Sequence, residues 1–205
     1  MIIYDSHTHK LKTNAIVNIA PSDAIVPGFT YSVGLHPWNI DSITDTDIQK
    51  LAEKAQNKQV LAIGEGGIDR NIAVPIDIQE DILKIHSKIS EQSAKPLIIH
   101  CVRSWNDIIR LKKELRPTCK WIIHGFRGKP EIARQMINHG IILSFGNHFN
   151  KSSLATAYPN NFLLETDDSG IEISEVAKIA SAAINIEINQ LVRASNSNYK
   201  QIFHI

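Results

Sequence analysis

Cysteine is scarce in this chain, which carries only Cys101 and Cys119 among its 205 residues. The two follow no metal-ligand spacing, and they are too few to hold a domain of this size together by disulfides. We therefore expect reduced thiols in a reducing compartment, with a disulfide between the two cysteines as the alternative.

Long apolar runs are also missing. No uninterrupted apolar stretch approaches the ~20 residues that span a bilayer. The N-terminal sequence MIIYDSHTHK has no basic leader followed by a long apolar segment. These absences predict a soluble, cytoplasmic protein that does not associate with a membrane.

The chain has no excess of charge of either sign. Lys and Arg total 22 against 21 Asp and Glu, a formal net charge of +1. Such a chain exerts no long-range attraction on nucleic acid or on an anionic membrane. Any polyanion would have to be held by a local patch of positive charge.

Short apolar runs rich in β-branched residues recur along the chain, and no linker, low-complexity tract or long repeat divides them. The clearest lie at 2–4, 61–64, 97–100, 121–124, 142–146 and 162–165. Runs that are apolar at successive positions suit strands buried on both faces, as in a parallel sheet. Stretches with helical spacing separate them, for example Ile78, Ile82, Ile85 and Ile89. This alternation predicts one α/β domain over residues 1–205.

Several residues mark the expected helix ends. Asp77 is expected to cap a helix that ends before Pro96. Pro130 suits the first turn of a later helix, and Gly140 suits its end.

The first 60 residues are less regular. The runs at 15–20 and 31–37 have the composition of strands, but only KLKTN separates the first of them from the HTH turn. A parallel crossover usually needs about a dozen residues or more. Residues 15–20 therefore either pair antiparallel with the first strand or lie in a barrel whose preceding helix is deleted. We favour eight strands in a TIM-type (β/α)8 barrel that is distorted and short of helices near the N-terminus.

Side chains that bind metals stand where these apolar runs end. They are His7, His9, Glu65, His100, His124 and Asp167. The carboxyl ends of parallel barrel strands meet on one face, where active sites are built. His7 and His9 are two residues apart, so in extended backbone both imidazoles project to the same side. One such histidine is more often structural than a ligand, but six donors at one edge predict a metal site.

Four imidazoles and two carboxylates exceed what one catalytic zinc ion requires, and they suit divalent ions such as Zn²⁺, Mn²⁺, Co²⁺ or Ni²⁺, with Mg²⁺ also considered. We expect two divalent metal ions. Glu65 would bridge them, with His7, His9 and Asp167 on one ion and His100 with His124 on the other. Two ions about 3.5–4 Å apart lower the pKa of water and supply a hydroxide nucleophile. Asp167 would also accept a proton from that water, unless it serves as a ligand alone.

Substrate-binding residues are expected on the same loops. His36 in GLHPW could bind a phosphate, and Trp38 could stack a base, although packing is the more common use of such a residue. Arg103 offers a planar fork of donors for phosphate, with an ion pair to Asp69 or Glu65 as the alternative. Arg127 would extend the same basic edge.

The ordered set DSHTH, GLHP, AIGEGGID, LIIHCVRS, IIHGFRG and LLETD resembles the TatD-like metal-dependent hydrolases over nearly the whole chain. The resemblance implies a distorted TIM barrel, a divalent-metal site and phosphoester hydrolysis on DNA. It also implies the same six metal ligands: His7, His9, Glu65, His100, His124 and Asp167. The chain departs from the family pattern in its short segment between HTH and GLHP, in Arg127, and in Asp168, Ser169 and Gly170 after Asp167.

Three functions compete at this point. The first is metal-dependent hydrolysis of phosphodiesters, with DNA or another phosphoester as substrate and no protein partner implied. The second is an amidohydrolase or esterase that acts on a small molecule with the same site. The third is a metal-stabilised homologue without catalytic activity.

Overall fold

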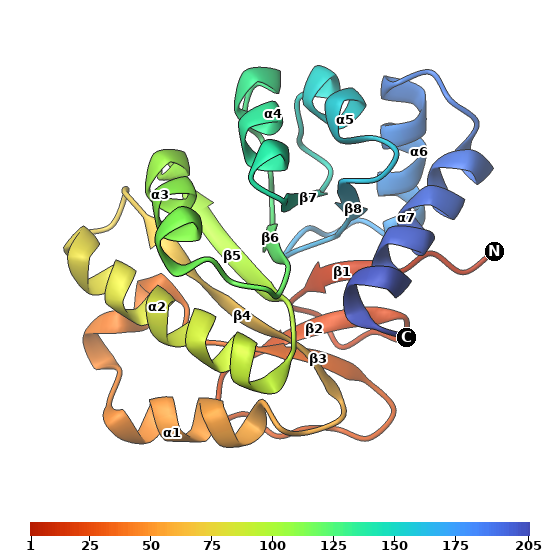
Figure 1. Cartoon of the computed structure of the whole chain (residues 1–205). Helices are drawn as coiled ribbons and strands as arrows, with labels where there is room; N and C mark the ends of the chain where they lie inside the picture. Colours follow the sequence, from red (N-terminus) through yellow and green to blue (C-terminus); the bar gives the residue numbers. More distant parts are fainter.

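Eight parallel strands form one sheet that curves into a nearly closed barrel (Figure 1). The computed structural model describes residues 1–205. The strands are β1 Asp5–Thr8, β2 Ala15–Ile19, β3 Thr30–Val33, β4 Val60–Asp69, β5 Leu97–Val102, β6 Trp121–Ile123, β7 Ile141–Phe145 and β8 Phe162–Leu164. They follow one another around the sheet in chain order, and each neighbouring pair is parallel. The expected barrel is confirmed.

Helices lie outside the strands and are missing near the N-terminus, as expected (Figure 1). They are η1 Pro37–Ser42, α1 Asp45–Lys54, α2 Ile76–Ser93, α3 Trp105–Leu115, α4 Pro130–Asn138, α5 Lys151–Ala157, α6 Ile173–Ala183 and α7 Ile188–Phe203. No helix follows β1 or β2. None of the helices has both the length and the apolar character that a membrane crossing requires.

The first two strands settle the alternative left open by the sequence. β2 pairs parallel with β1 across the short connection 9–14. Asn14, at the end of that connection, has a positive φ of 56° and accepts a hydrogen bond from the Asp5 backbone N at 2.9 Å. Asparagine tolerates this left-handed conformation better than most residues. The strand therefore lies in the barrel with its preceding helix deleted.

The first strand begins later than the sequence indicated. Residues 2–4 form no strand, and β1 begins at Asp5. The reason is a competing contact with α7. Tyr4 stacks on Tyr199 with ring centroids 4.6 Å apart, and its backbone N donates to Asn196 Oδ1 at 3.2 Å. The termini consequently lie near each other (Figure 1).

The expected helix boundaries are confirmed at α4 and at the end of α2, which stops at Ser93 before Pro96, whereas the expected cap of α2 at Asp77 is wrong. Pro130 occupies the first turn of α4, and Gly140 follows its end with a φ of +71°. At α2 the capping position is Pro75, and no side chain caps the helix. Because the helix begins at Ile76, Asp77 lies inside the first turn, where its carboxylate accepts only from the Ile78 backbone N at 3.0 Å.

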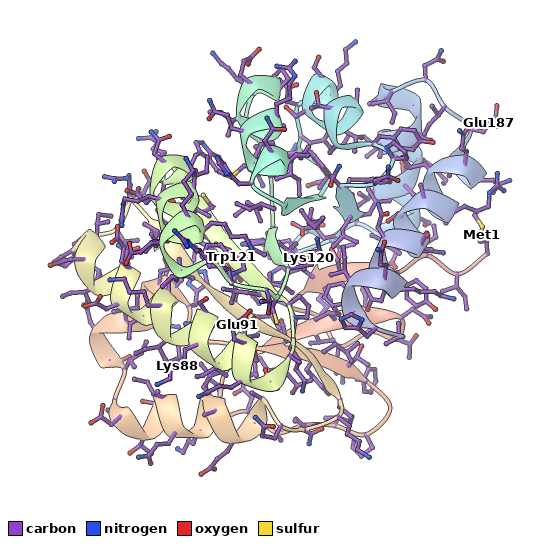
Figure 2. All side chains as sticks on the ribbon, in the orientation of Figure 1. Met1, Lys88, Glu91, Lys120, Trp121 and Glu187 are labelled. Atoms are coloured by element: carbon purple, nitrogen blue, oxygen red, sulfur yellow. The ribbon has the colours of Figure 1, made fainter.

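The larger of two apolar clusters lies between the sheet and its helices. Trp121 at the start of β6 is fully buried in it. Glu91 on α2 accepts from the Thr118 backbone N at 3.1 Å and from the Cys119 backbone N at 2.7 Å. Figure 2 shows Glu91, Lys120 and Trp121 on the same side of the molecule. This carboxylate therefore ties α2 to the loop that enters β6.

The second apolar cluster fills the interior of the barrel toward the amino ends of its strands. The strands supply Ile16, Ala62, Ile98, Ile122, Ile142 and Leu163. The end of α7 adds Tyr199, Ile202 and Phe203. Because this apolar layer closes one end of the barrel, the carboxyl ends of the strands form the end available for a site.

We predict that Phe203→Ala lowers the free energy of unfolding by about 3–5 kcal/mol, since it empties a site that is only 4% exposed. Urea unfolding followed by circular dichroism measures this. Ile205→Ala is the matched control, because Ile205 is 54% exposed and should change stability by less than about 0.5 kcal/mol. Equal effects of the two substitutions would contradict the role of α7 in closing the barrel.

Candidate metal centre

The six expected metal donors lie together at the carboxyl ends of the strands. His7 belongs to β1, Glu65 to β4 and His100 to β5, whereas His9, His124 and Asp167 directly follow strands or lie just beyond them. Five of these residues, all except His7, line a cavity of about 370 Å³ together with His36, Trp38 and Asp168. His7 is buried and is not among the residues that line the cavity.

The Glu65 carboxylate lies at the centre of the cluster, and one of its oxygens faces the first strand. Glu65 Oε2 is 3.3 Å from His7 Nε2 and 3.5 Å from His9 Nε2. The same two nitrogens are 3.6 and 3.5 Å from Asp167 Oδ1. Two imidazoles and two carboxylate oxygens therefore surround one point.

The other oxygen of Glu65 faces a different set of histidines. Glu65 Oε1 is 2.7 Å from His100 Nδ1 and 2.7 Å from His124 Nε2. These two nitrogens are 3.2 Å apart. His36 Nε2 approaches the same oxygen at 3.1 Å. Because His36 Nδ1 accepts from the Trp38 backbone N at 3.2 Å, a neutral His36 carries its proton on Nε2 and donates it to Glu65.

A buried carboxylate on β1, the first strand, holds the segment that follows β8, the last strand, beside this cluster. Asp5 accepts from the Thr166 backbone N at 3.0 Å and from the Thr166 hydroxyl at 2.6 Å. Next to it, the Asp167 backbone N donates to the His7 carbonyl at 2.9 Å. Asp167 itself has a φ of +50°. These bonds fix Asp167 against His7 and His9. Burial raises the pKa of Asp5 to about 6.

Glu65 is held by its backbone as well as by its carboxylate. Its backbone N donates to Asn18 Oδ1 on β2 at 2.8 Å. The same amide oxygen accepts from the Ser32 hydroxyl at 3.1 Å. Three neighbouring strands thus determine where the Glu65 carboxylate lies.

Two carboxylates that the sequence did not single out as site residues stand behind the histidines of the second set. Asp69 Oδ2 is 3.3 Å from His100 Nε2, the ring nitrogen turned away from Glu65. Glu165 Oε1 is 3.7 Å from His124 Nδ1 and accepts from the Gly125 backbone N at 2.5 Å. Metal-binding histidines commonly have such a carboxylate behind the ring, where it fixes the orientation of the imidazole.

His86 on α2 supports the site from outside the cavity. Its Nδ1 donates to the Ile82 carbonyl at 2.8 Å, and its Nε2 accepts from the Leu35 backbone N at 2.9 Å, next to His36. A Cβ at Gly66 would meet the His86 ring at 2.8 Å, so glycine at this position lets the ring approach the strand of Glu65. Burial lowers the pKa of His86 to about 4, which keeps the ring neutral.

The charges in the cluster are strongly coupled. Hydrogen bonding to Asp167 and then to Glu65 raises the pKa of His9 to about 9. Burial acts against ionisation of Asp167, but the hydrogen bond from His9 and the charges of His124 and His7 lower its pKa to about 2. Burial likewise opposes the charged forms of Glu65 and His124, yet each holds the other charged, with the pKa of Glu65 well below and that of His124 well above the usual range.

The donor set fits a divalent cation. His7 is 1% exposed, and neither of its ring nitrogens has a hydrogen-bond partner. Buried polar atoms without a partner are rare, and Nε2 of His7 points between two carboxylate oxygens. Three groups of His, Asp and Glu atoms here could each hold an ion. A bound cation would replace the protons on these imidazoles, so its binding is coupled to proton release.

The expected substrate residues are only partly brought together. His36 lines the cavity. Arg127 lies beside it, lining a small hollow next to Asp167 and Asp168. The Arg103 side chain is exposed, lines no part of either cavity, and makes no ion pair with Asp69 or Glu65. The roles of Arg103 and Arg127 stay predictions.

Trp38 differs from the sequence-based expectation that it packs against the fold. Its side chain is 65% exposed at the cavity, since η1 places it outside the barrel. Trp121 is buried, and Trp105 packs against the core.

This chain folds as an α/β barrel that carries a cluster of imidazoles and carboxylates at the carboxyl ends of its strands. That combination is typical of metal-dependent barrel proteins. A family profile described as TatD related DNase matches residues 3–204. The chain therefore belongs to the TatD-related DNase family of metal-dependent hydrolases. The resemblance carried by the sequence motifs is confirmed.

Curated relatives carry consistent names. The chain is 30% identical over 149 residues to the uncharacterised metal-dependent hydrolase YabD of Bacillus subtilis, a match covering 68% of this chain and 58% of that protein. It is 26% identical over 203 residues to the uncharacterised metal-dependent hydrolase BU355 of Buchnera aphidicola, covering 85% and 77%. It is 26% identical over 164 residues to the deoxyribonuclease Tat-D of Schizosaccharomyces pombe, covering 71% and 53%. The chain thus spans less than two thirds of the length of YabD and of the yeast protein.

A solved structure shares the fold. The TatD homologue YjjV from Escherichia coli superposes with a TM-score of 0.81 at 19% sequence identity, covering 93% of this chain and 86% of that one. At this identity the match concerns the fold alone, and it agrees with the barrel described above.

We predict that His86 makes stability depend on pH between about 6.5 and 4. In the unfolded chain the imidazole has its ordinary pKa of about 6.5, whereas in the folded protein burial lowers its pKa to about 4. Stability therefore falls as the pH decreases through this window, by about 3 kcal/mol in total. Urea unfolding of the wild type and of His86→Gln across pH 4–7 measures the effect. The variant should be less stable at pH 7, with a smaller loss toward pH 4, and parallel curves would refute the assignment.

Proposed function

We propose that the protein is a divalent-metal-dependent phosphodiesterase, with DNA as the leading substrate. The observation that carries the proposal is the Glu65 carboxylate, which turns one oxygen toward His7 and His9 and the other toward His100 and His124. Such a carboxylate suits a bridge between two cations. The name of the deoxyribonuclease Tat-D of Schizosaccharomyces pombe supports DNA as the substrate.

The six donors would hold two ions, chosen from Zn²⁺, Mn²⁺, Mg²⁺, Co²⁺ or Ni²⁺. His7, His9 and Asp167 would bind one of them, and His100 and His124 the other, with Glu65 between them. When bound, such ions neutralise charge on a phosphodiester and lower the pKa of water toward neutrality.

The residues of the chain supply positioning and proton transfer. Asp167 Oδ1 lies at the cavity beside His9, where it can accept a proton from an attacking water. Its low pKa keeps the Asp167 carboxylate ionised at neutral pH, as a proton acceptor must be. His36 lines the cavity and would contact a phosphate oxygen of the substrate by turning its Nε2 proton from Glu65 to that oxygen. Arg127 and Arg103 are the further candidates for contact with phosphate.

A small-molecule amide or ester is the second candidate substrate, because no Lys or Arg lines the 370 Å³ cavity. Hydrolysis of bis-p-nitrophenyl phosphate and of oligonucleotides, without hydrolysis of amides or lactones, separates the two functions. We also propose a reducing, cytoplasmic location, which the two free thiols support.

We predict that Glu65→Ala and His100→Ala each lower the turnover of a phosphodiester by about a thousandfold or more, since several kcal/mol of charge stabilisation is lost with the ions. The purified variants should also contain fewer metal ions per chain, measured by elemental analysis. Glu172→Ala is a matched control, because Glu172 is exposed and 73% of its side chain is accessible. Near-normal turnover in either site variant would contradict the assigned roles. A metal-loaded wild type inactive on all substrates would favour a non-catalytic protein.

We predict that Arg127→Ala and Arg103→Ala raise the Michaelis constant for a phosphodiester several-fold and change turnover by less than about twofold, as expected for groups that only hold the substrate. Arg110→Ala is the control, since Arg110 on α3 pairs with Glu80 and Glu114 away from the cavity. A larger effect on turnover than on the Michaelis constant would move the residue to stabilisation of the transition state.

A further inference from the structure

An exposed tryptophan stands at the mouth of the metal centre. Trp38 is 65% exposed, the highest exposed fraction among the large apolar side chains outside the N-terminal residue. It lines the same cavity as Glu65, His100 and His124. Most of its apolar surface is therefore open to solvent beside the proposed reaction centre. Single exposed apolar residues are common on protein surfaces, but this one lies at the candidate metal centre, where an aromatic face suits contact with a ligand.

The ring has a defined orientation although it is exposed. Trp38 Nε1 donates to Asp69 Oδ2 at 2.8 Å. The same oxygen lies 3.3 Å from His100 Nε2. The backbone of Asp69 is held in turn by the buried Gln79, whose Oε1 accepts from the Asp69 backbone N at 2.7 Å. A chain of hydrogen bonds thus runs from the barrel to the edge of the indole.

A histidine supports the indole on another side. The Trp38 and His36 rings meet edge to face, with centroids 4.9 Å apart and an interplanar angle of 82°. The centroid of the His100 ring is 6.1 Å away. The contacts with Asp69 and His36 hold the indole in one orientation, so its accessible part forms a rigid surface. Only His36 separates this surface from Glu65. A rigid aromatic surface loses little entropy when a ligand stacks on it.

The charges around the cavity favour a neutral contact with the substrate. No Lys or Arg lines it, and Asp23 and Asp168 add negative charge at its edge. The formal net charge of the chain is only +1. Inside this cavity no Lys or Arg side chain would bind a nucleic acid backbone, and Arg127 lies only in the neighbouring hollow, whereas stacking of a base on an aromatic ring needs no charge.

We propose that Trp38 is the platform on which one unpaired nucleobase of the substrate stacks while the adjoining phosphodiester lies at Glu65. The inference rests on the phosphodiesterase function proposed above. A single exposed ring needs a base with a free face, and bases inside a duplex are covered by their neighbours. The platform therefore selects nucleotides in single strands or at frayed ends, and Asp69 acts as a positioning residue for the ring.

Dinucleotides with and without bases test the platform. The substrates are dTpdT and two versions of it, each lacking one base, measured on the metal-loaded wild type and three variants. We expect the wild type to lose roughly tenfold in kcat/KM for one of the abasic versions. Trp38→Ala should lose this preference for the base, while Trp38→Phe, which keeps an aromatic face, should retain most of it. Trp105→Phe is the matched control and should keep the full preference.

The same set of variants separates stacking from an effect through Asp69. Loss of the Trp38 hydrogen bond to Asp69 would slow Trp38→Ala and Trp38→Phe equally on all three dinucleotides, and that pattern would overturn the platform. Turnover of bis-p-nitrophenyl phosphate without turnover of any dinucleotide would overturn it as well but leave the phosphodiesterase intact. Inactivity on every phosphodiester would refute both.

Binding gives a second readout that does not depend on turnover. Thymidine monophosphate added to the wild type should quench part of the tryptophan fluorescence, because Trp38 is the exposed tryptophan whereas Trp121 is buried. The quenching should disappear in Trp38→Phe and persist in Trp105→Phe. Equal quenching in the wild type and in Trp38→Phe would contradict stacking on Trp38.

Discussion

The burial of one carboxylate among five imidazoles is the interaction on which the rest of this structure depends. Glu65 is only 2% exposed, and a charge removed from water in this way is costly unless it is paired. His7 and His9 approach one of its oxygens, and three further histidines approach the other. These partners come from different strands and loops, so the carboxylate is satisfied only when the barrel is assembled. The same arrangement concentrates donors for cations at one place.

The barrel keeps this site open by closing its other end. The end of α7 contributes Tyr199, Ile202 and Phe203 to the apolar layer between the amino ends of the strands. At the open end, Asp5 and Thr166 join β1 to the loop after β8 and so complete the ring of strands around the cluster. The short connection between β1 and β2 contains no helix and ends at Asn14, which has a left-handed conformation. A compact barrel can therefore present the full set of donors.

Much of the fold and of the donor set could be predicted from local patterns. The apolar runs before His100 and His124 identify buried parallel strands, and the position of both histidines at the carboxyl ends follows from that. The predicted start of the first strand was too early, because residues 2–4 have the composition of a strand. In the structure Tyr4 instead stacks on Tyr199, near the other end of the chain. No local pattern announces such a contact.

The supporting residues were beyond the reach of sequence patterns for the same reason. Asp69 is the last residue of β4 and Glu165 directly follows β8, and only their place behind His100 and His124 distinguishes them from other carboxylates near strand ends. His86 reads as one more residue of an amphipathic helix until its ring is seen between Ile82 and Leu35. The exposure of Trp38 depends on η1, a short turn that the pattern of the chain does not specify.

The central claim is that the Glu65 carboxylate lies between two cations. Crystals grown with Mn²⁺ and measured by anomalous diffraction address it most directly. We predict two anomalous peaks about 3.5–4 Å apart, one between His7, His9 and Asp167 and the other beside His100 and His124. A single peak, or peaks that leave Glu65 uncoordinated, would contradict the bridging role of this carboxylate.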